Sequence, residues 1–304
     1  MRTSVKAGQE TGAHEIEFRH GGWRLAGTLQ LPPDGTARVA VALVHGSGKA
    51  TRDVWRTLAS RMALAGIASL RYDKPGCGQS EGDWTAQGFE DRAHEALAAL
   101  QALSENLPAP GRCIGLAGGS QGGWIVLLGA SLSPAVEFAV CFSTAGVSPA
   151  DQEAFRIEHH LPAEGLSRDE CKRALDDAPR RLGSGDLGTR GTVPGGAWYS
   201  LLGATTLSEL EFDLRVYDFD ATTVLERVRC PILAIWGERD LLVPVEASFA
   251  AFDAASNKAG RLEDELHVIE GADHGLRRPG SDDIPTVVTD TTVSWVMRIC
   301  PGLH

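Results

Sequence analysis

The sequence lacks several features that would assign it to a particular class of protein. No apolar stretch approaches the roughly 18 residues that a transmembrane helix needs, and residues 1–15 lack the apolar segment of a secretory signal peptide. Basic residues are also in deficit, because 29 lysines and arginines face 40 aspartates and glutamates, a net charge of −11. Such a surface repels phosphates and anionic lipid heads, so we expect neither nucleic-acid binding nor attachment to membranes.

Closely spaced cysteines and metal-ligand motifs are missing as well. The six cysteines are scattered over positions 77, 113, 141, 171, 230 and 300, without a C-x-x-C pair. A chain of 304 residues can bury a core without cross-links, so we expect reduced thiols in a cytoplasmic protein. The histidine pair at positions 159 and 160 has no partner at ligand spacing. We therefore expect neither a metal nor an organic cofactor.

Glycine is abundant, with 35 residues, and short apolar runs alternate with helical patterns after residue 38. Residues 14–19 and 24–31 predict a hairpin through Gly21 and Gly22. Further strands are predicted at residues 39–44, 67–72, 113–117, 136–142, 231–236 and 266–269, and helices at 53–65, 85–103, 121–131, 246–255 and 284–298. This order predicts an α/β fold with a mostly parallel central sheet and helices on both faces.

The alternation stops between residues 147 and 229. Charged helical patterns, a glycine-rich piece and scattered aromatic residues occupy this stretch. We expect a core of residues 1–146 plus 230–304 and an inserted lid, or cap, of residues 147–229. Six aromatic residues of the lid are candidates for lining a pocket or for forming the core of the lid itself: Phe155, Trp198, Tyr199, Phe212, Tyr217 and Phe219. The G-x-G-x-x-G match at residues 183–188 follows no strand, which argues against a dinucleotide site.

Residues 118–122, Gly-Gly-Ser-Gln-Gly, match the pattern G-x-S-x-G between a predicted strand and a predicted helix. A nucleophilic serine on such a sharp turn needs small neighbours, which Gly118 and Gly122 supply. The turn places the Ser120 hydroxyl at the carboxyl end of the sheet, beside the N–H groups that open the next helix. The alternative is a glycine-rich turn whose serine only caps that helix.

A serine nucleophile needs a base and an acid that orients the base. His274 follows the last predicted strand, and Asp240 follows the strand before it. The chain order Ser120, Asp240, His274 is that of the G-x-S-x-G class of hydrolases. Asp273 and Glu238 are competing acids, but Asp273 adjoins the histidine and Glu238 comes earlier in its turn. We therefore favour Asp240.

The loop after the first parallel strand supplies a further candidate. His45, Gly46, Ser47 and Gly48 follow residues 39–44, and a glycine-lined loop there can bring a backbone N–H beside the serine. We expect the N–H groups of Ser47 and Gln121 to form an oxyanion hole. The other residues of the loop would support it, with His45 bracing it instead of acting as the base. A plain turn at the end of a strand is the alternative.

These segments together resemble the α/β-hydrolase superfamily, in particular its serine esterases and prolyl-oligopeptidase-like members. The resemblance covers about residues 20–146 and 230–299 and is carried by the sequences at residues 25–29, 45–48, 71–80, 118–122, 237–240 and 273–275. It implies a structural role for Asp73, while Cys77 occupies a position that often holds arginine or another residue in relatives. The stretch between the two parts resembles no family that we can name.

We expect a serine hydrolase that cleaves a carboxylic ester of a small molecule through an acyl-enzyme intermediate. Ser120 would be the nucleophile, His274 the base and Asp240 the residue that orients the base. A thioesterase, a peptidase or an acyltransferase would use the same triad. A non-catalytic protein that binds a small ligand remains an alternative from a different class, because a fold alone does not fix a function.

Overall fold

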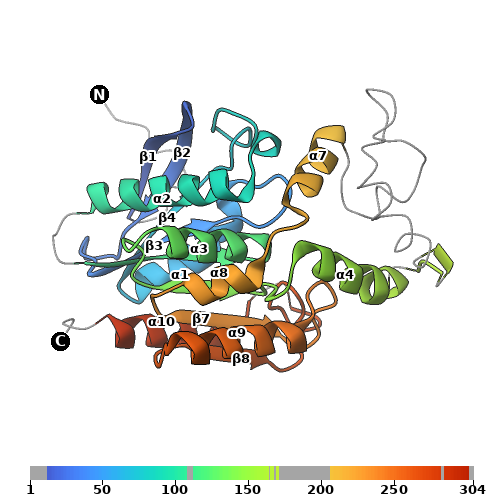
Figure 1. Ribbon diagram of the computed structural model, residues 1–304. Coiled ribbons are helices and arrows are strands. Elements are labelled where there is room, and N and C mark those ends of the chain that lie inside the picture. Colours follow the sequence, from blue (N-terminus) through green and yellow to red (C-terminus); the bar gives the residue numbers. More distant parts are fainter. Residues whose placement is uncertain are drawn as a thin grey trace.

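The computed structural model describes residues 12–107, 112–163, 165–167, 169–170, 206–281 and 284–300, and it confirms the predicted α/β architecture. Within these residues, eight strands form one sheet in the order β1-β2-β4-β3-β5-β6-β7-β8 (Figure 1). The first two strands form the predicted hairpin and run antiparallel to their neighbours, and the remaining strands pair in parallel. The strands are β1 (Ala13–His20), β2 (Trp23–Gln30), β3 (Val39–Val44), β4 (Ile67–Tyr72), β5 (Cys113–Gly119), β6 (Ala139–Phe142), β7 (Ile232–Gly237) and β8 (Glu265–Ile269).

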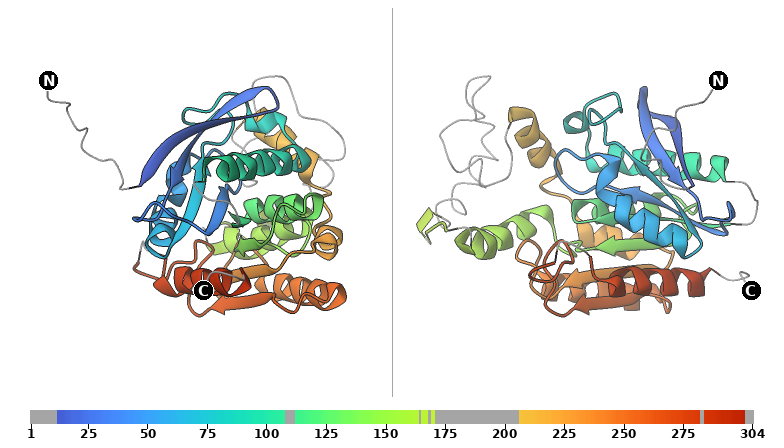
Figure 2. Two further views of the ribbon diagram at one scale, coloured as in Figure 1. Left: turned by 90° about the vertical axis from the view of Figure 1, so that its left-hand side faces the viewer. Right: turned by 180° about the vertical axis from the view of Figure 1, so that it is seen from behind.

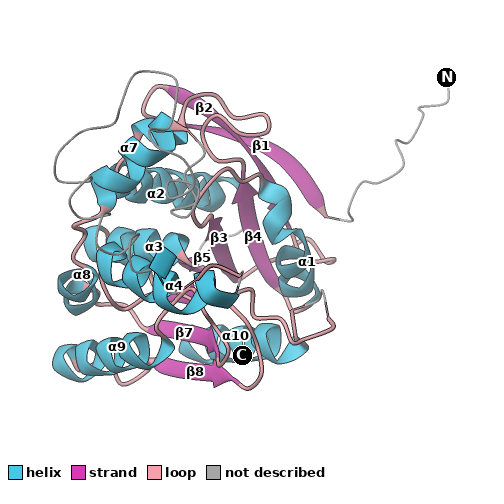
Figure 3. Cartoon of the chain, turned by 90° about the vertical axis from the view of Figure 1, so that its right-hand side faces the viewer, coloured by secondary structure: helices cyan, strands magenta, loops and turns pink. Residues whose placement is uncertain are grey.

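Helices cover both faces of the sheet (Figures 2 and 3). One face carries α2 (Phe89–Asn106), α3 (Gln121–Leu132), α8 (Ala221–Arg227) and α9 (Val245–Ala259), and the other carries α1 (Arg56–Leu64) and α10 (Thr286–Ile299). Two further helices, α4 (Pro149–Ala163) and α7 (Leu207–Val216), lie to the right in Figure 1. Short 3-10 turns at Arg52–Trp55 and Trp84–Ala86 precede α1 and α2.

The apolar run of β3 lets this strand contribute to the hydrophobic cores on both faces of the sheet. All six of its residues are buried, and successive side chains of a strand point to opposite faces of the sheet. Ala40, Ala42 and Val44 pack beneath the α2 and α3 face, while the alternate residues pack beneath α1 and α10. Burial on both faces is what a continuous run of β-branched and small apolar residues predicts.

Two boundaries differ from the sequence-based expectation. Helix α2 begins at Phe89 and not at residue 85, because Gln87 and Gly88 are extended and the Gly88 N–H donates to the Asp91 carboxylate at 2.8 Å. Strand β6 begins at Ala139, since a turn precedes it in which the Val136 N–H donates to the Ser133 carbonyl at 3.2 Å. Both shifts come from local capping and turn contacts that apolar periodicity does not report.

The expectation of reduced cysteines is wrong for two of them. Cys113, at the start of β5, forms a disulfide with Cys300, which follows α10. The two residues lie 187 positions apart in the chain, but the packing of α10 against the sheet brings their Cα atoms to 5.8 Å, a separation that a disulfide spans. Among the described cysteines, Cys77, Cys141 and Cys230 are free.

Some sequence-based expectations concern residues that the structure does not describe. The glycine pattern at residues 183–188, Trp198 and Tyr199 lie outside the described residues. In the part of the chain that is described, no helix is long and apolar enough to cross a membrane. The same part contains no group of three or more histidine, cysteine or carboxylate side chains that could hold a metal ion.

Candidate active site

Ser120 occupies the sharp turn between β5 and α3, as the sequence predicts. Its backbone has φ 53° and ψ −126°, a conformation that is strained for any residue with a side chain. The Ser120 N–H donates to the Phe142 carbonyl at 2.8 Å, and the Ser120 carbonyl accepts from the Gly123 N–H at 2.9 Å. These bonds from the neighbouring strand and from the first turn of α3 hold the residue in this conformation.

The glycines on either side of Ser120 are required by close packing. A Cβ atom on Gly118 would lie 2.5 Å from the Gly122 carbonyl oxygen, and one on Gly122 would lie 2.7 Å from the carbonyl oxygens of Val44 and His45. Real Cβ atoms do not approach other atoms this closely. The turn that carries Ser120 therefore packs directly against the end of β3 and the loop that follows it.

His274 and Asp240 come together at the same edge of the sheet. His274 lies in the loop after β8, and its Nδ1 is 2.7 Å from Asp240 Oδ2. The Asp240 side chain is completely buried, and its Oδ1 accepts from the backbone N–H groups of Leu242 and Val243 at 2.8 and 2.9 Å. The carboxylate is thus fixed on one side by its own turn and presents the other oxygen to the imidazole.

The two competing acids make other contacts. Asp273 Oδ1 accepts from the Arg277 N–H at 2.9 Å, and Glu238 Oε2 accepts from the Gly271 N–H at 2.8 Å. Both therefore stabilise the turns around β7 and β8. Asp240 is the carboxylate that contacts His274 among the described residues.

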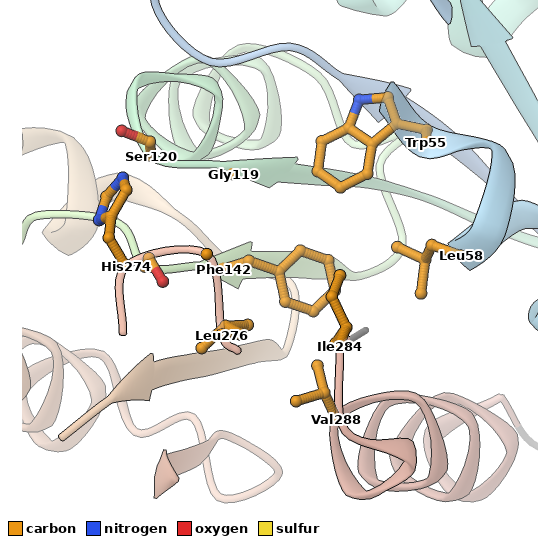
Figure 4. Close-up of a pocket in the computed structure, with 11 residues that line it drawn as sticks. Trp55, Leu58, Gly119, Ser120, Phe142, His274, Leu276, Ile284 and Val288 are labelled. Atoms are coloured by element: carbon orange, nitrogen blue, oxygen red, sulfur yellow. The ribbon is translucent and has the colours of Figure 1, made fainter. Parts of the chain in front are cut away.

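Ser120 and His274 lie side by side at one end of an apolar cavity (Figure 4). Both residues also line a second, larger cavity. The hydrogen bonds of the described residues do not include one between the Ser120 hydroxyl and the imidazole. Such bonds are often long in unliganded hydrolases and tighten when substrate binds. Because Nδ1 faces Asp240, Nε2 is the ring nitrogen left to serve the hydroxyl.

Two backbone N–H groups are available beside Ser120. Ser47 lies in the loop after β3, and Gln121 is the first residue of α3. Both residues line the larger cavity together with Ser120. Within the described residues, neither backbone N–H donates to another atom of the chain. The N–H of Gln121 also lies at the positive end of the α3 dipole, so the arrangement suits a developing negative charge.

His45 and Asp73 lie behind these donors and not in the cavities. The His45 ring is buried, its Nε2 contacts the Tyr72 carbonyl, and burial lowers its pKa to about 3. The imidazole is therefore neutral at ordinary pH and braces the loop. Asp73 accepts from the backbone N–H groups of Arg52 and Gln79, each at 2.9 Å, which joins the chain after β3 to the chain after β4.

The smaller cavity has a volume of about 160 Å³. Its wall is largely apolar and comes from both halves of the chain, with Ser120 and His274 at one end (Figure 4). The apolar side chains are Trp55, Leu58, Phe142, Leu276, Ile284 and Val288. This cavity suits an apolar group attached to the reacting centre.

The larger cavity, of about 540 Å³, has more polar side chains in its wall than the smaller one and reaches α4 and α7. Arg156 of α4 donates to both carboxylate oxygens of Glu153, at 2.6 and 2.8 Å. Asp213 of α7 has no such partner among the described residues, and burial together with Glu153 and Glu209 raises its pKa to about 7. Helices from the predicted lid therefore contribute charged side chains to the space in front of Ser120.

Sequence reasoning missed a buried arginine behind the site. Arg92 of α2 is 1% exposed, and its guanidinium donates to the Gln121 side-chain oxygen at 2.6 Å and to the His45 carbonyl at 2.7 Å. It thereby links the two segments that carry the free N–H groups. The sequence held one sign that Arg92 is buried. Arg92 and Glu95 fall on the same face of α2 as its buried apolar residues.

Comparisons with known proteins agree with this fold. A profile described as the alpha/beta hydrolase family matches residues 41–282. A search of curated protein sequences finds no match. Similar solved structures include DcsB in complex with its substrate analogue, with 17% identity, a TM-score of 0.66 and coverage of 95% of this chain and 100% of that one. The esterase Pf2001 of Pyrococcus furiosus is similar as well, with 16% identity, a TM-score of 0.64 and coverage of 95% of this chain and 91% of that one. Est1E of Butyrivibrio proteoclasticus with bound ferulic acid has 19% identity, a TM-score of 0.62 and coverage of 94% of this chain and 100% of that one.

Proposed function

Because the chain belongs to the alpha/beta hydrolase family, we propose that it is a serine hydrolase that cleaves a carboxylic ester of a small molecule through an acyl-enzyme intermediate. The observation that carries the proposal is the hydrogen bond between His274 and the buried Asp240. The same histidine lines two cavities together with Ser120. The similarity of the fold to structures named as esterases supports the choice of an ester as substrate.

In the first half of the reaction, Ser120 Oγ attacks the ester carbonyl carbon while His274 Nε2 takes the hydroxyl proton. The carbonyl oxygen becomes an oxyanion, and the free N–H groups of Ser47 and Gln121 stabilise it. Asp240 holds the imidazole in the required tautomer and stabilises the imidazolium. The proton on Nε2 then passes to the alkoxide oxygen, and the alcohol leaves an acyl group on Ser120.

In the second half, His274 takes a proton from water, and the resulting hydroxide oxygen attacks the acyl carbon. The same two N–H groups bind the second oxyanion. The tetrahedral intermediate collapses, Ser120 Oγ regains the proton from His274, and the carboxylic acid is released. Side chains of this chain and one water molecule account for every atom and proton transferred.

We also propose that α4 and α7 belong to a cap that covers the larger cavity and that ends before α8, because α8 packs on the sheet beside α3 and α9. The support for this division is that both helices contribute polar side chains to that cavity, in front of Ser120. The cap would then select the part of the substrate that extends away from the apolar cavity.

A fluorophosphonate probe tests the proposed function without knowledge of the natural substrate. We expect the probe to label the unaltered chain at Ser120 and to leave Ser120→Ala unlabelled. Hydrolysis of p-nitrophenyl acetate by the unaltered chain should be lost in His274→Ala. Equal turnover by the unaltered chain and His274→Ala, or labelling that persists in Ser120→Ala, would contradict the proposal and favour a binding protein.

A further inference from the structure

A buried lysine lies directly behind the loop that carries the Ser47 N–H. Lys74 follows β4 and is completely buried. Its ammonium donates to the carbonyl oxygens of Gly46 at 2.9 Å and Gly48 at 2.7 Å, and the Trp84 ring centroid lies 4.5 Å from Nζ. An ammonium has three donors, so two carbonyls and one aromatic face account for all of them. Among the described residues, no carboxylate forms an ion pair with Lys74.

This placement is unfavourable for a cation. Burial lowers the pKa of Lys74 well below its usual range, and the nearby Arg92 acts in the same direction. Glu95, Asp213 and Cys77 act in the opposite direction without forming a direct bond. A buried cation without an ion-pair partner destabilises a fold. Proteins keep such unfavourable placements of a side chain most often where function requires them.

The planarity of the peptide bond connects Lys74 to the active site. In a trans peptide, the carbonyl of one residue and the N–H of the next point in opposite directions, and no cis peptide occurs in the described residues. The Gly46 carbonyl points at Lys74, so the Ser47 N–H points away from Lys74. Ser47 lines the cavity that contains Ser120. Arg92 holds the preceding carbonyl, of His45, in a similar way.

We propose that Lys74 is the positioning residue of the oxyanion hole, which by binding the carbonyls of Gly46 and Gly48 directs the Ser47 N–H toward the oxygen of the carbonyl that Ser120 attacks. The inference rests on the proposed function. The hydrogen bond from Lys74 Nζ to the Gly46 carbonyl also polarises the peptide between Gly46 and Ser47, which makes the Ser47 N–H a stronger donor.

The test compares Lys74→Met, which removes the donors, with Lys74→Gln, which keeps a neutral amide donor. Each variant is assayed for its rate of labelling by a fluorophosphonate, which forms an oxyanion-like adduct, and for kcat and KM on p-nitrophenyl acetate. We expect Lys74→Met to lower kcat and the labelling rate in parallel by about 10- to 100-fold, somewhat less than outright removal of an oxyanion donor. KM should stay within about threefold, and Lys74→Gln should recover part of the loss.

Arg261 provides a matched control. It is another buried cation that donates to two backbone carbonyls, but these belong to Leu225 and Val228, which line neither cavity, whereas Gly46 lines the cavity that contains Ser120. Unlike Lys74 within the described residues, it also forms an ion pair, with Asp264 at 2.8 Å. Arg261→Met should lower the unfolding temperature and leave kcat unchanged. If Lys74→Met does not fold, a smaller loss of kcat at unchanged KM in Lys74→Gln carries the test.

The outcomes separate the two proposals. Normal labelling of the unaltered chain, together with a kcat and labelling rate in the Lys74 variants within twofold of it, overturns the inference alone. A loss of kcat in Lys74→Met that Arg261→Met reproduces reduces Lys74 to a structural role and also overturns it. Absence of labelling in the unaltered chain overturns the proposed function and the inference together.

Discussion

At Ser120 the backbone adopts φ 53°, which costs on the order of 1–3 kcal/mol in a residue with a side chain. The contacts that hold it there come from β6, from the first turn of α3 and from the close approach of Gly122 to the end of β3. The sequence predicted this turn because the glycine pattern lies between a strand and a helix. It did not predict that Lys74 and Arg92 lie behind the turn, because the groups to which they donate come from distant segments of the chain.

The assignment of the acid can be tested with a matched pair of variants. Asp240→Asn should lower kcat on p-nitrophenyl acetate by about 10³- to 10⁴-fold, because an amide favours the wrong imidazole tautomer. Asp273→Asn should leave kcat within about threefold, since Asp273 bonds to the Arg277 N–H and not to His274. Steady-state kinetics of both variants measures the difference. A larger effect at position 273 would reverse the assignment.

Asp213 gives the protein a pH-dependent stability. Its pKa is raised from 3.8 to about 7 in the folded chain, so between these values the folded state holds a proton that the unfolded state has released. The free energy of unfolding therefore falls as pH rises through this window. The effect is complete above about pH 7 and is on the order of a few kcal/mol.

Asp213→Asn keeps the shape of the neutral acid and cannot ionise. It should raise the free energy of unfolding at pH 8, and by a smaller amount at pH 5. Urea unfolding at both values measures this, with Asp218→Asn at a neighbouring exposed site as the control. A gain that is equal at the two pH values would show that ionisation of Asp213 is not the cause.

Among the elements, strands were easier to predict than helices or their contacts. The ranges of β3 and β4 agree with the sequence-based expectation at both ends, because each is a short, mostly apolar run with glycine or a polar residue on either side. Helix α2 begins later than its periodicity suggests, since the Asp91 carboxylate caps Gly88. The apolar cavity was not predicted, because its wall joins α1, β6 and α10, which are far apart in sequence.

The size of that cavity limits what it accepts. An apolar protein cavity of about 150 Å³ binds benzene, so a cavity of about 160 Å³ should take a group of similar size. Val288→Phe should lower kcat/KM for methyl phenylacetate or benzyl acetate, whichever the unaltered chain prefers, by about tenfold or more relative to methyl acetate.

The exposed neighbour Val287, which lies outside the cavity, supplies the control. Val287→Phe adds the same bulk and should leave the ratio of the two rates unchanged. An equal loss on both esters in Val288→Phe would indicate general damage and not a filled cavity.

For the whole molecule, the sequence predicted the class of fold and the edge of the sheet at which Ser120, Asp240 and His274 lie. The order of the strands and the disulfide required the folded chain, because residues 187 positions apart give no local signal. The described part of the chain places Cys113 at the start of β5, and Ser120 follows the other end of the same strand. The cross-link and the proposed chemistry are therefore separated by the length of one strand.

Loss of the disulfide should lower stability and leave catalysis intact. Cross-links that close long loops typically contribute about 2–4 kcal/mol. Cys113→Ser with Cys300→Ser should lower the free energy of unfolding in urea by this amount, and a reducing agent should do the same to the unaltered chain. Cys230→Ser, at a free thiol, is the control. If the reductant has no effect on the unaltered chain, the bond does not form in solution.

The disulfide also matters for mutations that are meant to change which substrates the cavity accepts. Helix α10 supplies Val288 to the apolar cavity from its first turn, and Cys300 ties the far end of the helix to β5. New side chains in the first turn can therefore reshape the cavity while the rest of the helix stays anchored. Directed evolution of the proposed enzyme can begin at that turn, which carries none of the residues proposed to transfer a proton.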